Sequence, residues 1–175
     1  MDSAALDIAG VLSETGARRS YAGVVDVPIL TLGAVEFRLT APARFDLDLS
    51  NTGGSVLVQG TVSVETSVDC CRCLRPFRLE LTADVETLLV RPDDVGLMPQ
   101  DADFVVVETD LWEAGPYLLS ALAEVAPFAP VHAEDCRGIC PGCGADLNEG
   151  DCDCDRTAPE SPFARLKDMF DTQEG

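Results

Sequence analysis

The sequence has few basic residues and a single histidine, His132. It holds 12 lysines and arginines against 31 aspartates and glutamates, which gives a formal net charge of −19. No apolar stretch approaches the roughly 20 residues that a membrane-spanning helix needs. The start of the chain has neither a basic region nor an apolar run, so we expect no signal peptide. A glycine-rich phosphate-binding loop is also lacking. We therefore expect a cytoplasmic protein with no membrane contact and no small-molecule substrate.

The negative charge is concentrated in the second half of the chain. Residues 1–83 hold 10 acidic and 7 basic side chains, whereas residues 84–175 hold 21 acidic and 5 basic ones. A field of this sign opposes unspecific contact with nucleic-acid phosphates and favours encounter with a basic partner. Solubility alone is the other interpretation of the same charge.

Apolar and polar residues alternate over much of residues 21–107, which is typical of half-buried antiparallel strands. With 175 residues and 46% hydrophobic content, the chain is long enough to bury a core without disulfide bonds. We expect the two longest strands at 56–68 and 76–90, joined as a hairpin by residues 70–75. Shorter strands are expected at 21–27, 35–40, 45–49 and 104–108.

Helical signals follow the strands. Asp110 with Glu113 three residues later predicts a helix start, with a kink or restart at Gly115-Pro116 and an end at Pro127. A short amphipathic helix is expected from Ser161 to Phe170. The predicted fold class is α+β: mainly an antiparallel sheet or open β-barrel, with one or two helices and a C-terminal zinc-knuckle segment. Residues 1–130 would form the β domain with its packing helix, and residues 131–175 the cysteine-rich zinc-binding segment and terminal helix, together one folding unit.

Eight cysteines include two Cys-x-x-Cys pairs, far apart in the sequence. In a reducing cytosol, clustered cysteines more often hold metal than form disulfides. A tetrahedral structural zinc site takes four ligands, and we expect a structural Zn²⁺ ion on Cys70, Cys73, Cys140 and Cys143. The sequence leaves open whether other cysteines replace the first pair, the candidates being Cys136, Cys152 and Cys154. His132 is a further candidate ligand, and a metal-free set of reduced thiols is the remaining alternative.

Two other functions compete for the residues around the first cysteine pair. Arg72, Arg75 and Arg78 could form a small patch that binds RNA phosphate, or they could balance the charge of a thiolate zinc site. A thiol oxidoreductase that uses Cys70 and Cys73 would want a helix beginning at the first cysteine, but a β-type pattern follows instead. We therefore expect no enzyme and no catalytic residue.

A strand that ends in Cys-x-Arg-Cys-Leu at 70–74, an acidic loop, and Gly-Ile-Cys-Pro-x-Cys-Gly at 138–144 form a recognisable combination. Together with Ser-Pro-Phe-Ala-Arg-Leu at 161–166, they resemble the large ribosomal RNA subunit accumulation protein (YceD) family. The resemblance implies a bacterial factor needed for synthesis, processing or stability of large-subunit ribosomal RNA. We hypothesise a non-enzymatic ribosome-biogenesis factor whose acidic half contacts a basic ribosomal protein. Its partners would be the large ribosomal subunit precursor, a ribosomal protein and/or rRNA.

Overall fold

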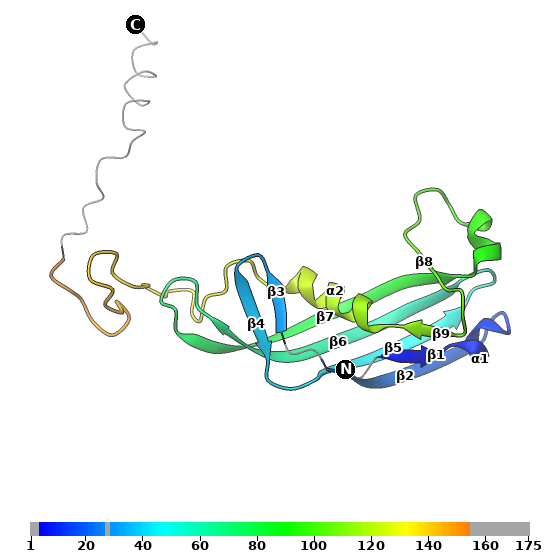
Figure 1. Ribbon diagram of the computed structural model, residues 1–175, viewed down its shortest axis with the longest axis horizontal. Coiled ribbons are helices and arrows are strands. Elements are labelled where there is room, and N and C mark those ends of the chain that lie inside the picture. Colours follow the sequence, from blue (N-terminus) through cyan, green and yellow to red (C-terminus); the bar gives the residue numbers. More distant parts are fainter. Residues whose placement is uncertain (1–3, 27–28, 155–175) are drawn as a thin grey trace, which may run out of the picture. The chain divides into compact units, whose positions relative to one another are not determined.

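The computed structural model describes residues 4–26 and 29–154 (Figure 1). The terminal helix expected at 161–170 lies outside this range. The described residues form two compact units: residues 4–71 with 75–132, and residues 72–74 with 133–154. The sequence-based division at residue 130, with both parts in one folding unit, stays a prediction.

The first unit is organised around a long hairpin of β6 (Val56–Asp69) and β7 (Pro76–Val90). Its register runs from Val56 opposite Leu89 to Asp69 opposite Pro76. The two strands predicted from the alternating pattern are present, with bounds within one residue of those expected. Because every other residue of a strand faces the same side, one side of the hairpin is apolar and the other is polar.

Five further strands extend this hairpin into one sheet (Figure 1). The other long edge of β6 pairs with β5 (Ala43–Asn51) and, nearer its end, with β4 (Val35–Leu39). Outer strands are β2 (Arg18–Val25) beside β5 and β3 (Ile29–Leu32) beside β4. All these pairs are antiparallel, and only the short β8 (Val105–Val106) runs parallel to β7. The sheet does not close into a barrel, so the α+β prediction is confirmed in its open antiparallel form.

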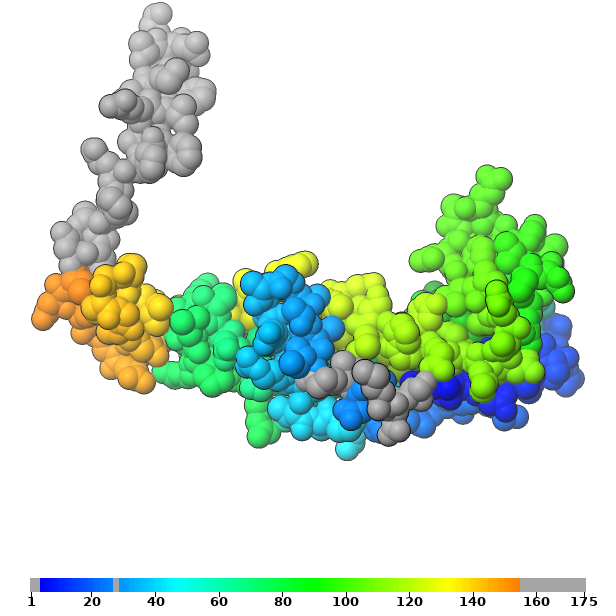
Figure 2. All heavy atoms as spheres, in the orientation of Figure 1, coloured from blue at the N-terminus to red at the C-terminus, as the bar shows by residue number. Residues whose placement is uncertain are grey.

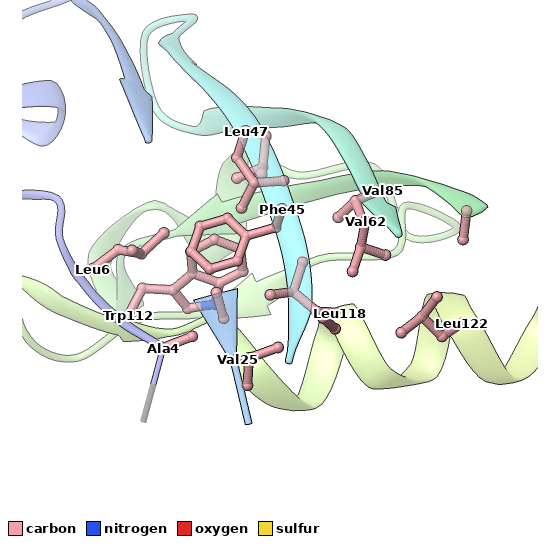
Figure 3. Packing of buried hydrophobic residues seen from close by; sticks show 14 of the residues in the cluster. Ala4, Leu6, Val25, Phe45, Leu47, Val62, Val85, Trp112, Leu118 and Leu122 are labelled. Carbon is pink, nitrogen blue, oxygen red and sulfur yellow. The ribbon is translucent and has the colours of Figure 1, made fainter. Parts of the chain in front are cut away.

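Alternation along β5 shows how the sheet acquires its core face. Phe45, Leu47 and Leu49 are buried, whereas the intervening Asp46 and Asp48 are exposed. The buried residues meet others from β6 and β7 in a single cluster (Figure 3). Burial of each such side chain stabilises the fold by roughly 1.5–3 kcal/mol. This burial holds the sheet together although its other face is polar.

Gly60 lets β5 and β6 approach each other closely. It lies opposite Leu47 in the register. A Cβ atom at this position would lie 2.0 Å from the Asp46 carbonyl oxygen, a distance that forces backbone to move. Glycine is therefore required here by packing between strands.

The helix α2 (Gly115–Val125) covers the apolar face and packs on β7 and β6. Its buried residues Leu118 and Leu122 point toward Val62 and Val85 of the sheet (Figure 3). The helix begins with Pro116 in its first turn, where a missing N–H is tolerated. Its C-cap is Ala126, and Pro127 follows as the predicted end of the helix.

The helix start predicted at Asp110 is wrong. Residues Leu111–Glu113 form strand β9, which pairs with β1 (Ala5–Asp7) in a separate two-stranded sheet. This pairing buries Trp112, which is 2% exposed, opposite Leu6. Tertiary burial of the only tryptophan thus overrides the local capping pattern.

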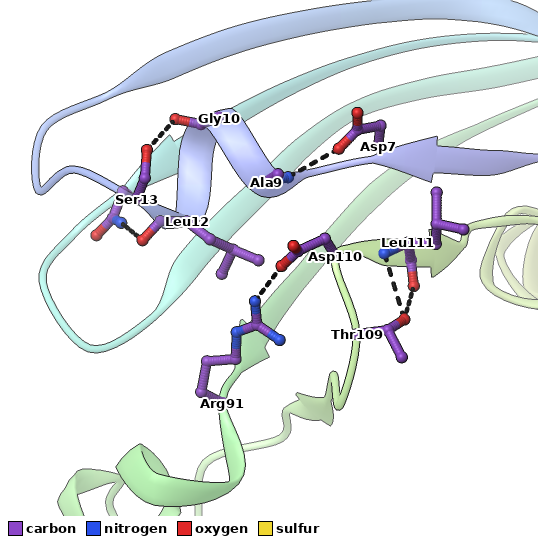
Figure 4. Close-up of polar contacts among 10 residues, drawn as sticks. Asp7, Ala9, Gly10, Leu12, Ser13, Arg91, Thr109, Asp110 and Leu111 are labelled. Atoms are coloured by element: carbon purple, nitrogen blue, oxygen red, sulfur yellow. Dashed lines mark hydrogen bonds and ion pairs between the residues drawn. The ribbon is translucent and has the colours of Figure 1, made fainter.

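Asp110 serves a different purpose from a helix cap (Figure 4). Its carboxylate contacts the guanidinium of Arg91, at the end of β7. Its carbonyl oxygen accepts a hydrogen bond of 2.8 Å from the N–H of Ile8, just before the short helix α1 (Ala9–Leu12). The polar residue therefore joins the N-terminal segment to the end of the central hairpin.

The segment after β7 contains the 3₁₀ helix η1 (Pro92–Leu97). Figure 2 shows this segment, in green, standing out from the sheet. Two of its residues, Asp93 and Asp94, lie in the first turn of η1, where the positive end of the helix dipole favours carboxylates. No helix among the described residues is long and apolar enough to span a bilayer.

Candidate metal centre

The cysteine-rich part of the second unit is built from turns. Residues 139 and 146 form an isolated antiparallel bridge. Inside it, the Cys140 N–H donates to the Ala145 carbonyl and the Gly144 N–H donates to the Cys140 carbonyl, each at 2.8 Å. Gly144 has a φ of +76°, a left-handed conformation that glycine adopts without steric cost. The turn places the two sulfur atoms of this Cys-x-x-Cys pair on one side.

Four cysteine sulfur atoms meet at this turn and lie within 4.8 Å of one another. We call them the C-terminal quartet: Cys140, Cys143, Cys152 and Cys154. Cys140 is buried and Cys143 is exposed, while the other two are intermediate. A Cβ atom on Gly142 would lie 3.5 Å from the Cys154 sulfur. The turn that carries Cys140 and Cys143 is therefore in van der Waals contact with the chain at Cys154.

Backbone amides are directed at the Cys140 sulfur. Hydrogen bonds from the N–H groups of Cys143 and Gly142, followed by one from the Cys152 side chain, lower the pKa of Cys140 from 9.0 to about 6. Hydrogen bonding to Cys143 and Cys140 instead raises the pKa of Cys154 to about 12. The amides thus stabilise negative charge on the Cys140 sulfur, which is the buried one of the four.

A second group of ligand-type side chains belongs to the turn that joins β6 and β7 and to the segment from His132 to Cys136. We call it the hairpin quartet: Cys70, Cys73, His132 and Cys136. Its three cysteines are buried. At the tip, the Cys70 N–H donates to the Arg75 carbonyl at 2.9 Å. The His132 ring meets Phe77 edge-on, with ring centres 6.5 Å apart.

The structure distributes the four predicted zinc ligands between these sets. Cys140 and Cys143 belong to the C-terminal quartet, and Cys70 and Cys73 to the hairpin quartet. That these four share a single ion stays a prediction. The local alternative, in which Cys152 and Cys154 complete the site, corresponds to the C-terminal quartet. The remaining cysteine, Cys71, is exposed and belongs to neither set.

Arg72 and Asn148 hold the turns of the second unit together. The Arg72 guanidinium donates to the carbonyls of Glu134 and Cys136, each at 3.0 Å. The Asn148 amide donates to the Cys136 sulfur at 3.6 Å, and its oxygen accepts from the Arg137 N–H at 2.8 Å. Sequence reasoning expected arginines beside the cysteines but missed Asn148, whose signal was an Asp-x-Asn turn sequence.

The donor atoms determine which ions either quartet could hold. Thiolate and imidazole suit zinc and other soft or borderline metals, whereas magnesium and calcium prefer oxygen. A cysteine site of four ligands is closed, because no position stays open for substrate. The C-terminal quartet is therefore compatible with a metal ion, and its ligand type favours zinc in a structural role.

An acidic groove lies in the first unit, along β7 and α2. Its volume is about 300 Å³, and its charged lining residues are all carboxylates. These carboxylates are Asp84, Glu86, Asp103 and Glu124. The hydroxyls of Tyr117 and Ser120 add hydrogen-bonding groups. No basic side chain lines this groove, so its field is uniformly negative.

Comparison with known proteins identifies the chain's relatives. The model of the family "Large ribosomal RNA subunit accumulation protein YceD" matches residues 58–170, a range that contains all eight cysteines. Uncharacterized proteins of Mycobacterium bovis and Mycobacterium tuberculosis are each 32% identical over 146 residues, 81% of this chain and 70% of theirs. A Mycobacterium leprae protein is 30% identical over 61% of this chain and 50% of its own length. No solved structure matches. The chain therefore belongs to the YceD family of large ribosomal RNA subunit accumulation proteins.

Proposed function

We propose that this protein is a non-enzymatic ribosome-biogenesis factor that contacts a basic ribosomal protein through its acidic surface. In this role the protein binds the precursor of the large ribosomal subunit and supports synthesis, processing or stability of the rRNA. The observation that carries it is the membership of the YceD family, combined with 21 acidic against 5 basic residues after position 83. A reducing cytoplasm is the compartment that suits its eight cysteines.

The acidic groove is the best candidate for the contact. Four acidic residues line this concave surface, so a lysine or arginine side chain entering it would meet negative charge. Exposed ion pairs are individually weak, about 0.2–1 kcal/mol each, but several acting together steer and orient a partner. Large-subunit ribosomal proteins that bind rRNA need basic surfaces for that purpose, which makes them suitable partners.

Direct RNA binding through the arginines near the hairpin is less well supported. Arg72 already donates to two main-chain carbonyls. Arg78 pairs with Glu65 at 2.9 Å. Phosphate would have to compete with these contacts and with a net charge of −19.

Thiol redox catalysis is also poorly supported. Cys70 is 0% exposed and Cys73 is 7% exposed, whereas a catalytic thiol has to be reached by its substrate. Residues 71–73 form a turn and not the start of a helix, so the helix that a redox Cys-x-x-Cys motif places at its first thiol does not begin there. We propose instead that the cysteines bind structural zinc, and that the protein has no enzymatic activity.

The test is a comparison of two triple variants in pull-downs from low-salt lysate. The groove variant neutralises three of its carboxylates: Asp84→Asn, Glu86→Gln and Glu124→Gln. The control neutralises three exposed carboxylates elsewhere: Glu14→Gln, Asp26→Asn and Asp46→Asn. Both changes reduce the net negative charge equally. The unchanged chain should recover basic large-subunit ribosomal proteins, and added salt should weaken this recovery.

We expect the groove variant to bind its partner about tenfold more weakly, which corresponds to about 0.5 kcal/mol for each charge removed. The control should change affinity much less. Equal losses in both variants would mean that net charge acts without the groove. Recovery of protein-free rRNA in place of ribosomal proteins would contradict the proposed partner.

A further inference from the structure

We propose that the C-terminal quartet binds one zinc ion as four thiolates, in a site closed entirely within residues 140–154. The inference rests on the structural zinc proposed above and is independent of the ribosomal role. It differs from the sequence-based prediction in its ligands, because Cys152 and Cys154 take the places of Cys70 and Cys73. The metal would then fasten a 15-residue stretch on itself.

The first support is the geometry around the ion's position. All four sulfur atoms lie within 4.8 Å of one another, as tetrahedral coordination with Zn–S bonds of about 2.3 Å requires. The Cys140–Cys143 turn carries hydrogen bonds of 2.8 Å at residues 140, 144 and 145. Two ligands are thus positioned by backbone that is already fixed, and the Cys-x-Cys pair at 152 and 154 lies against Gly142.

The second support is the lack of another source of stability in this unit. Among its described residues, the only buried ones are Cys73, Cys136, Gly138, Cys140 and Leu147. Among the described residues of this unit, the single bridge between residues 139 and 146 is the only regular pairing. Turns with so few buried side chains rarely hold their fold without a metal, disulfides or a partner. A zinc ion supplies this stability directly, since the free energy of metal binding becomes free energy of folding.

The third support is the chemistry of the donor set. Thiolates are the ligands that zinc and other soft or borderline metals prefer. Each protonated thiol releases its proton to the buffer on binding, so four thiolates and one Zn²⁺ give a centre of net charge about −2. The divalent cation offsets the repulsion that four adjacent thiolates would otherwise have.

The experiment measures the alkylation rate of each cysteine by mass spectrometry in the reduced full-length chain, with and without zinc. Cys143 and Cys71 are both exposed, so both should react in chelator-treated protein. With free zinc at 100 times the dissociation constant, Cys143 should react roughly one hundred times more slowly. Cys140, Cys152 and Cys154 should be protected with it. Cys71 should react at the same rate with and without zinc, because it is exposed like Cys143 but is not a ligand.

Variants assign the ligands. Replacing Cys152 and Cys154 by serine should remove one equivalent of bound zinc and restore the reactivity of Cys143, whereas Cys71→Ser should do neither. Serine at Cys70 and Cys73 should leave the protection of Cys143 intact. Loss of that protection in a variant whose Trp112 fluorescence is still native would support the shared site predicted from sequence and overturn the local one. A chain that binds no zinc would overturn both the local site and the structural zinc proposed earlier, without touching the ribosomal proposal.

Discussion

The main-chain N–H of Ile139 donates a hydrogen bond of 3.1 Å to the carbonyl oxygen of Arg72. The two residues are 67 positions apart in the sequence; Arg72 lies inside the first Cys-x-x-Cys pair, and Ile139 directly precedes the second. Gly138 allows this approach, because a Cβ atom there would lie 3.0 Å from the same oxygen. The cysteine-rich turns are therefore built on residues 72–74 as well as on their own segment.

The Arg72 side chain should matter more for structure than for RNA binding. Arg72→Gln removes two charged hydrogen bonds to carbonyl oxygens and should lower the local stability of the second unit by about 1–2 kcal/mol. Amide hydrogen exchange at Ile139 measures this opening. The control is Arg44→Gln, because the Arg44 side chain makes no hydrogen bond or ion pair within the described residues. An unchanged exchange rate would show that the Arg72 contacts contribute nothing.

Gly60→Ala should destabilise the sheet strongly. The new methyl group would need the space of the Asp46 carbonyl oxygen, 2.0 Å away, so β5 and β6 would have to separate locally. We expect a loss of about 1–3 kcal/mol, the usual cost of overpacking, measured by urea denaturation. Gly150→Ala is the matched control, because a Cβ atom there meets nothing within 4 Å. Equal stabilities of the two variants would contradict the close approach.

Leu47→Ala tests the core face. Leu47 is 0% exposed, and its truncation should cost about 2–5 kcal/mol through lost burial and the cavity left behind. The same measurement on Val24→Ala, a residue that is 51% exposed in the neighbouring strand β2, should show a change within about 0.5 kcal/mol. A small loss at Leu47 would mean that the core is loosely packed.

Where the hydrogen bonds of the turn at residues 140–145 persist without metal, the Cys140 thiol should titrate unusually low in reduced protein. Its pKa is lowered to about 6 by N–H groups that bond its thiolate in the folded chain. The resulting stabilisation is fully present above pH 9, the ordinary pKa of the thiol, and is lost as the pH falls through 6. Ultraviolet thiolate absorbance should rise near pH 6, and Cys140→Ser should abolish this step. Cys71→Ser should leave it in place; a step that persists without Cys140 would refute the assignment.

Cys143→Ala should release the metal and loosen residues 136–154 while the sheet survives. The core cluster runs from Ala4 to Ala126 and includes no residue of the cysteine-rich segment. Hydrogen exchange should therefore increase after residue 133 and stay unchanged in β6 and β7. Cys71→Ala is the control for the loss of a thiol. Melting of the whole chain in the Cys143 variant would show that the two units fold together.

The strands were predictable where burial alternates with exposure. Asp46 and Asp48 between buried neighbours reveal the period of β5 without any structure, and the β6–β7 hairpin follows from the same rule over longer runs. The pattern fails at Leu111–Glu113, because three residues carry no usable periodicity and their partner strand is Ala5–Asp7, more than 100 positions away. Of the leucines and valine at helical spacing between 111 and 125, Leu118 and Leu122 are buried, whereas Leu111 and Val125 are 59% and 47% exposed.

The sequence alone determined the α+β class, the central hairpin, the family and the eight cysteines as the place to look for metal, since each depends on local pattern or spacing. Which thiols lie together was decided only by tertiary structure. The two Cys-x-x-Cys pairs have the same spacing, so spacing does not say which cysteines bind the same ion. That depends on which sulfur atoms lie within bonding reach of one another in the folded chain. The turn at residues 140–145 brings Cys152 and Cys154 to Cys140 and Cys143, a proximity that spacing along the chain does not encode.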